Sequence, residues 1–119
     1  MIFRLFACLA VVASPVWATC PVPPDHQQAL RALIEKAQQA PNEAAGRALS
    51  NQMWALWSDA PDAYAQNLLD SGMSRREIYD YAAAMKAFDA LVEYCPEYAE
   101  GYNQRGFIHF LREDFDKAL

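Results

Sequence analysis

The sequence has little of what builds a strand-rich or a catalytic protein. It holds four glycines and two histidines, with no Gly-rich loop and no low-complexity segment. No stretch alternates apolar and polar residues as a half-buried strand does. A histidine-dependent triad would have to use His26 or His109, and neither has a nucleophile pattern nearby. These absences favour an all-α fold and a protein that is not an enzyme and carries no cofactor.

Positive charge is scarce as well. The chain has ten basic and fifteen acidic residues, a net charge of −5. An acidic surface repels phosphate backbones and anionic lipid heads, so nucleic acids and membrane surfaces are poor candidate partners. We expect the partners to be proteins or neutral ligands.

Long apolar runs are absent apart from one near the N-terminus. Residues 5–13 are apolar, follow the positive Arg4 and precede the small-x-small pattern Val16-Trp17-Ala18. The run is far shorter than the roughly 20 residues that cross a bilayer, and its setting is typical of an export signal. We therefore predict that residues 1–18 are a signal peptide cleaved after Ala18. No membrane insertion is expected after cleavage, and the mature protein is expected in the periplasm.

Cysteine is limited to three residues, and Cys8 falls within the predicted signal. The remaining pair, Cys20 and Cys95, predicts a disulfide in an exported protein. It would join an extended arm, residues 19–24, to the body. Two unpaired thiols are the alternative, because the sequence does not give the distance between them. A metal site built from Cys20, His26 and Cys95 lacks the paired ligand spacing of zinc sites, so no metal is expected.

Helical periodicity is the pattern that the sequence does have. Asp25 and Asn42 can each cap a helix, which predicts an N-terminal hairpin over residues 25–60. Trp54 and Trp57, three residues apart, share one face of the second helix. We interpret them as the core of this hairpin, with exposed binding aromatics as the alternative.

The rest of the chain repeats itself with a period of 34 residues. Sliding the sequence by that length aligns four identical pairs: Ala65 with Ala99, Gly72 with Gly106, Asp80 with Asp114, and Ala84 with Ala118. This period is typical of stacked helix-turn-helix units. It predicts one repeat over residues 65–98 and a second, truncated repeat over 99–119. A competing capping box from Ser74 to Glu77 would instead start a helix at Arg75.

The period and its residues resemble the tetratricopeptide repeat (TPR). The segments "YAEGYNQRGF" and "DFDKAL" carry an early aromatic, a small residue and two later anchors, Tyr102, Gly106, Phe115 and Ala118, as in exported bacterial members of that family. The resemblance implies an α-α superhelix, a solenoid of stacked hairpins. The hairpin over 25–60 is then a degenerate repeat or a cap. Because such stacks need about three units, we expect residues 1–119 to be a fragment of a longer protein.

Three residues of the second repeat carry specific expectations. Gly106 is expected to let its helix approach the small Ala118 closely. Arg105 is expected to pair with an acidic side chain on the partner helix, just past residue 119. His109 stands where the repeat usually packs an aromatic ring, so we expect a satisfied interior histidine.

The resemblance also implies how the protein works. TPR arrays hold an extended peptide or a helix on a concave side lined by first-helix residues. The matching positions are Gln66, Leu69, Asp70, Met73, Arg76 and Glu77 in the first repeat, and Glu100, Asn103, Gln104, Phe107 and Phe110 in the second. Acidic residues outnumber Arg76 on this face. We therefore expect a neutral, apolar or mildly basic partner segment rather than a carboxylate.

The expected function is therefore non-catalytic: an exported scaffold or adaptor that binds a protein or peptide. One alternative is a small-ligand or peptide-capture protein, which a saturable ligand that raises the melting temperature would favour. Another is an accessory domain of a larger envelope enzyme. The sequence leaves the identity of the partner and the oligomeric state open.

Overall fold

Residues 19–119 are described by a computed structural model, and within them the fold is all-α, as predicted. The predicted signal peptide, residues 1–18, lies outside the described residues. A first hairpin consists of α1 (Gln27–Gln38) and α2 (Glu43–Trp57). A helical body follows, made of α3 (Ala63–Glu77), α4 (Tyr81–Tyr94), α5 (Ala99–Leu111) and the short α6 (Phe115–Ala118). No helix within residues 19–119 is long and apolar enough to cross a membrane.

Short polar side chains fix the starts of three helices. Each accepts a hydrogen bond from the backbone N–H three residues further on, which satisfies one of the free donors of the first turn. These bonds run to Asn42 from Ala45 (2.9 Å), to Asp62 from Ala65 (2.8 Å) and to Asp80 from Ala83 (3.1 Å).

The first helix starts one residue later than a cap at Asp25 implies. The N-cap position of α1 is His26, whose side chain makes no capping hydrogen bond. The Asp25 carboxylate instead accepts from the backbone N–H of Gln27 at 3.0 Å. Asp25 therefore still satisfies a free donor of the first turn, from the position before the cap.

The turn between α3 and α4 recurs 34 residues later between α5 and α6. Tyr79 and Glu113 occupy the left-handed region, with φ of 62° and 61°. In each turn the following aspartate donates its backbone N–H to a carbonyl five residues back, from Asp80 to Arg75 and from Asp114 to His109, both at 3.0 Å. This is a Schellman motif, which ends a helix by satisfying its last carbonyls. Because α3 runs on to Glu77, no helix starts at Arg75.

The core lies where α3, α4 and α5 pack together. Leu69, Phe88, Leu91 and Ile108 are fully buried there, and α4 contacts both of the other helices. Gly72 of α3 lies directly against the ring of Phe88, because a Cβ at this position would stand only 2.3 Å from Cε1 of that ring. A side chain at Gly72 is therefore incompatible with this packing.

The close approach expected at Gly106 occurs at Gly72 instead. A Cβ at Gly106 would meet only the carbonyl oxygen of Ala118, at 3.4 Å. Ala118 is thus the neighbour of Gly106, as expected, but the separation is an ordinary contact. The difference arises because the residue that crowds Gly72 is the large Phe88, deep within α4.

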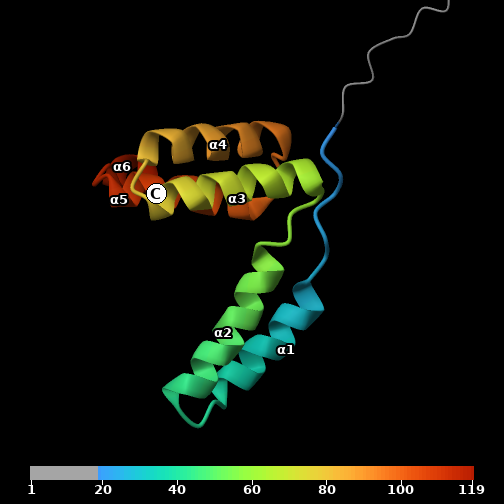
Figure 1. The fold of residues 1–119 in the computed structure, drawn as a ribbon. Coiled ribbons are helices and arrows are strands. Elements are labelled where there is room, and N and C mark those ends of the chain that lie inside the picture. The colour runs from blue at the N-terminus through green and yellow to red at the C-terminus, as the bar shows by residue number, and fades with distance from the viewer. Residues whose placement is uncertain (1–18) are drawn as a thin grey trace, which may run out of the picture.

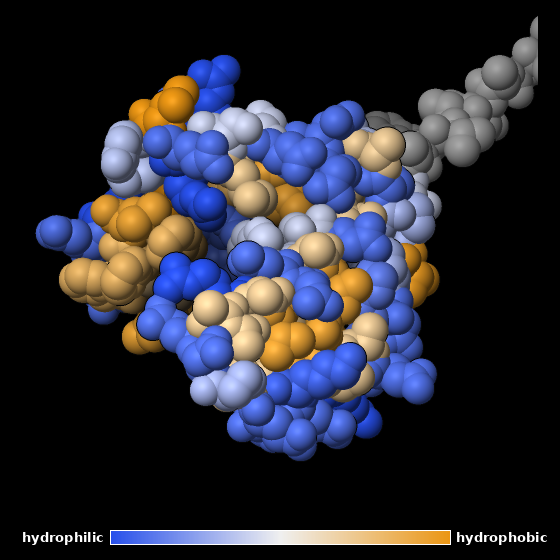
Figure 2. All heavy atoms as spheres, turned by 60° about the horizontal axis from the view of Figure 1, so that its bottom comes forward, coloured by the Kyte–Doolittle hydropathy of each residue, from blue (hydrophilic) through white to orange (hydrophobic). Residues whose placement is uncertain are grey.

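The first hairpin stands apart from the body in Figure 1, and α1 and α2 pack mainly on each other. Neither helix has a buried residue. Trp54 and Trp57 are 36% and 42% exposed, so their interpretation as hairpin core is wrong. Two helices cannot enclose a core by themselves, and each leaves part of its apolar stripe open. Figure 2 shows apolar residues gathered over this hairpin at the lower front.

One hydrogen bond joins the hairpin to the body directly, two polar contacts hold the linker between α2 and α3, and a disulfide fastens the arm to the body. The Tyr98 hydroxyl donates to the carbonyl oxygen of Trp57 at 2.8 Å, and burial raises the pKa of Tyr98, so the hydroxyl keeps its proton. His26 Nε2 and Asp59 Oδ2 are 2.8 Å apart, and Ala60 N–H donates to the Gln66 side chain at 3.0 Å. These contacts all gather at the linker between α2 and α3.

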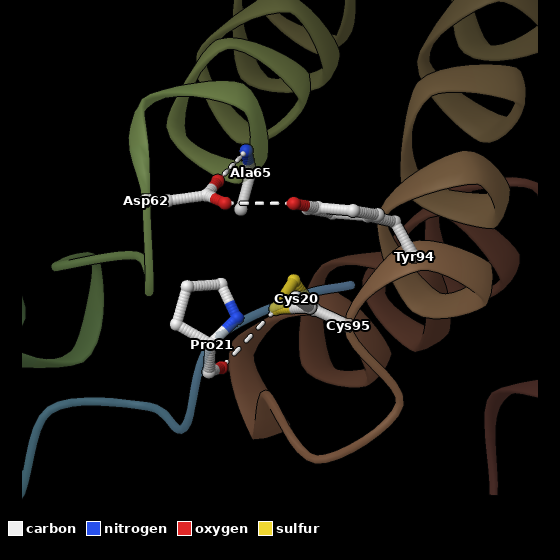
Figure 3. The surroundings of a disulfide bond; sticks show 6 residues. All are labelled: Cys20, Pro21, Asp62, Ala65, Tyr94 and Cys95. Carbon is white, nitrogen blue, oxygen red and sulfur yellow. Dashed lines mark hydrogen bonds between the residues drawn. A yellow bond between two sulfur atoms is a disulfide. The ribbon is translucent and has the colours of Figure 1, made fainter. Parts of the chain in front are cut away.

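The covalent bond is the predicted disulfide between Cys20 and Cys95. Their Cα atoms are 5.2 Å apart and the two residues are 75 apart in sequence. It fastens the N-terminal arm to the C-terminal end of α4 (Figure 3). The dashed line to the carbonyl oxygen of Pro21 marks a 3.4 Å contact. It is not a hydrogen bond, since a disulfide sulfur carries no proton.

Candidate protein-binding face

Three of the predicted binding residues meet where α3 and α5 run beside each other. The guanidinium of Arg76, on α3, donates a hydrogen bond to the side-chain oxygen of Gln104, on α5. Its central carbon also lies 5.4 Å from the centroid of the Phe107 ring, at cation–π distance. Arg76 is thereby held in one orientation across the two helices.

A polar network beneath this surface supports Arg76 and Asn103. The Gln104 amide donates to Glu100 at 2.6 Å, and the Asn103 amide donates to both carboxylate oxygens of Glu100 at 3.2 and 3.1 Å. Glu100 and Gln104 are both buried. The prediction that these two side chains contact a partner is therefore corrected. Their polar groups are already hydrogen-bonded to each other and to neighbouring side chains, because a buried polar group without a partner is costly.

Three of the predicted residues on α3 also contribute to the fold itself, through core packing or hydrogen bonds. Leu69 is fully buried in the core, and Met73 is partly buried against it, so Leu69 is removed from the binding set. Gln66 accepts from Ala60 N–H at 3.0 Å and donates to Asp70 at 2.9 Å, which fixes the α2–α3 linker. Helical spacing alone could not separate the face turned to the next hairpin from the face turned to solvent.

The two predicted phenylalanines lie at an exposed aromatic surface on α5 and α6. Phe107 and Phe110 are 42% and 55% exposed, with ring centroids 6.2 Å apart and planes at 11°. Phe115 of α6 packs edge-on against Phe110 at 5.9 Å. These rings and Tyr102 are called the aromatic edge below. They line a cleft of about 430 Å³ together with Asn103, Gly106, Ala118 and Leu119.

Tyr102, the early aromatic of the repeat, and Phe115, expected as a later anchor, are both exposed in the structure. The signal that could have found them is the cluster of four aromatic residues within fourteen positions near the end of the sequence. Clustered exposed aromatics with an adjacent Arg are the composition that protein interfaces favour. The aromatic edge is therefore the best candidate contact surface on the body.

Arg105 borders the aromatic edge through a different pairing from the one expected. Its guanidinium lies 3.6 Å from Asp89 of α4 and 5.3 Å from the centroid of the Tyr102 ring. The acidic partner is therefore on the preceding helix rather than past residue 119. The side chain reaches it because α4 packs directly against α5.

His109 lies under the α5–α6 turn, mostly buried, with Nδ1 3.5 Å from a carboxylate oxygen of Asp114. This nitrogen makes no hydrogen bond. His109 is therefore an interior residue, as expected, but its Nδ1 is not satisfied. A hydrogen bond from Lys117 at 3.0 Å is the main cause that lowers the pKa of Asp114, and the charges of Lys117, His109 and Arg112 add to it against the opposing effect of burial. These contacts hold the turn that positions Phe115.

No protein-family model, curated protein or solved structure matches this chain. Within residues 19–119, the structure establishes an all-α protein with an arm fastened by a disulfide.

Proposed function

We propose that this is an exported protein of the TPR type that works without catalysis, as a periplasmic scaffold or adaptor. It binds a partner protein through the aromatic edge, with Arg76 and Asn103 at its border. The single observation that carries the proposal is the exposure of Phe107 and Phe110 beside an arginine held in place by Gln104. Aromatic and arginine side chains dominate binding energy at protein interfaces, and an arginine that is already held in place, as Arg76 is, loses less side-chain entropy when it binds.

Two further observations support the repeat and export parts of the proposal. The Schellman turns at Tyr79 and Glu113 recur at the 34-residue spacing of the sequence repeat, which is the spacing of TPR units. A disulfide such as Cys20–Cys95 forms and persists in oxidising compartments. The acidic charge of the chain favours a partner segment that is apolar with neutral or basic flanks.

The test is site-specific photo-crosslinking in a periplasmic extract. A photo-reactive amino acid replaces Phe107, and in a matched control it replaces the exposed Lys86 of α4. We expect one protein to be captured through Phe107 and not through Lys86, and its capture to disappear in a Phe110→Ala background. Ile34→Ala removes an exposed apolar side chain of α1, in the first hairpin, and should leave the capture unchanged. Equal capture from both positions, or none from Phe107, would count against the proposal.

A further inference from the structure

A second cleft, separate from the aromatic edge, opens beside the disulfide. It has a volume of about 600 Å³, which is within the range of small-molecule sites. One wall is the arm, with Pro21 and Pro23, and the other is the C-terminal end of α4 together with Tyr64 of α3. The Cys20–Cys95 bond holds the two walls together, so the cleft exists only while the arm is fastened.

The aromatic wall of this cleft is rigid. Tyr64 and Tyr94 pack edge to face, with ring centroids 4.8 Å apart and planes at 83°. The Tyr94 hydroxyl donates to one oxygen of Asp62 at 2.7 Å, while the other oxygen accepts from Ala65 N–H at 2.8 Å. Figure 3 shows Tyr94 reaching across from α4 to Asp62, directly above the disulfide. Tyr64 is 56% exposed, which leaves part of its ring open to a ligand.

The cleft is negatively charged. Glu93 and Glu97 line it, and none of its described lining side chains is basic; after the predicted cleavage the α-amino group of Thr19, which also lines the cleft, adds a single positive charge against these two carboxylates. Neither glutamate takes part in the ion pairs found within residues 19–119. The C-terminal end of α4 also lines the cleft, and its last turn has no basic residue. A helix C-terminus carries a partial negative charge. The Glu93 carboxylate adds a further negative charge at the same end, and the two together favour a bound cation.

We propose that this cleft binds a small organic cation, an ammonium ion with an apolar body. Aromatic rings beside carboxylates are the surroundings that such cations prefer. The positive group would lie against the exposed ring of Tyr64, near Glu93 and Glu97. The apolar body would contact the prolines of the arm. This site is independent of the aromatic edge, so the proposal does not rest on the proposed protein-binding function.

The test is calorimetric titration of the oxidised mature protein with choline and, separately, with butylammonium. The neutral isostere of choline, 3,3-dimethyl-1-butanol, is the control ligand. We expect saturable binding of at least one of the two cations and none of the isostere. Added salt should weaken the binding, because the attraction is electrostatic and the site is open to solvent. No saturable binding of either cation, or equal binding of the neutral isostere, would overturn the proposal.

Variants locate the site. Glu93→Gln, Glu97→Gln and Tyr64→Leu should each weaken the binding about 2- to 30-fold, the range for one cation–π or charge contact. Glu113→Gln and Tyr79→Leu, which change an exposed acid and an exposed ring elsewhere, should have no effect. Tyr64→Phe keeps the ring and should keep the affinity. Unchanged affinity in the first three variants, or a loss in Tyr64→Phe as large as in Tyr64→Leu, would contradict the proposed contacts.

Discussion

Replacing Gly72 with alanine would test the packing between α3 and α4 directly. The added methyl carbon would stand 2.3, 2.6 and 2.8 Å from three carbons of the Phe88 ring. To restore a contact of about 3.4 Å, the ring or the helix must move by roughly 1 Å, in a core where shifts of that size are resisted. Phe88 is fully buried, so its ring has no open space beside it.

The magnitude follows from two opposing effects. Overpacking a well-packed core costs about 1–3 kcal/mol, and alanine in a helix is about 0.5–1 kcal/mol better than glycine. Because the contact of 2.3 Å is severe, the overpacking cost should lie near 2–3 kcal/mol, so we expect a net loss of about 1–2.5 kcal/mol in the free energy of unfolding. For a domain of this size each kcal/mol lowers the melting temperature by about 4–8 °C.

Gly106→Ala is the matched control, since it changes the equivalent residue of the second repeat. The added carbon meets only the Ala118 carbonyl oxygen at 3.4 Å, so the helix preference of alanine should prevail, and we expect stability to stay equal or rise by up to about 1 kcal/mol. Thermal and urea unfolding followed by far-ultraviolet circular dichroism measures both variants. Phe88→Leu in the Gly72→Ala background should cost less than it does in wild type, because it vacates the crowded space. If Gly72→Ala were as stable as wild type, the close contact with Phe88 would be refuted.

Three further predictions concern the disulfide, one cap and the turns. Reducing Cys20–Cys95, which are 75 residues apart, should lower the unfolding free energy by about 4.5 kcal/mol in the chain-entropy account, and a urea midpoint unchanged by dithiothreitol would disprove it. The pKa of Asp62 is lowered from 3.8, chiefly by the Ala65 N–H and then by the Tyr94 hydroxyl, so its stabilising contribution is complete above pH 3.8 and is lost as the pH falls through the folded-state pKa. Asp62→Asn keeps the cap without the titration, so melting temperatures measured between about pH 5 and 2 should depend less on pH than in wild type, and an equal dependence would show that Asp62 is not responsible. Tyr79→Gly should raise the unfolding free energy by about 1 kcal/mol, because glycine adopts the left-handed conformation without strain; denaturant titration would measure this, and a loss of stability would mean that the Tyr79 side chain matters more than its backbone.

Much of the fold could be predicted because its causes are local. The cap at Asn42 acts on a backbone group three residues away, and helical periodicity is visible in any window of the chain. The Schellman turns at Tyr79 and Glu113 recur at the 34-residue spacing of the sequence repeat, since both residues end their helices in the same way. The disulfide could be predicted because only two cysteines remain after residue 18.

The candidate site was only partly predictable. Phe107 and Phe110 are exposed as the binding hypothesis requires, whereas Gln104, on the same helix, and Leu69, on α3, are buried. Each position satisfies the same helical spacing, and the choice between them depends on where the neighbouring helix packs. The cleft beside the disulfide was invisible in the sequence, because its walls come from Pro21, Tyr64 and Tyr94, which are far apart along the chain.

The sequence by itself determined the helical class of the fold, the cap at Asn42, the 34-residue repeat and the candidate pairing of Cys20 with Cys95. The tertiary structure decided that Gly72 rather than Gly106 makes the close approach, that Trp54 stays exposed, and that Arg105 pairs back to Asp89. The physical reason is the distance along the chain over which each effect acts. Caps and periodicity arise from hydrogen bonds and side-chain spacing within a few residues, whereas burial and pairing depend on which surfaces meet when whole helices pack.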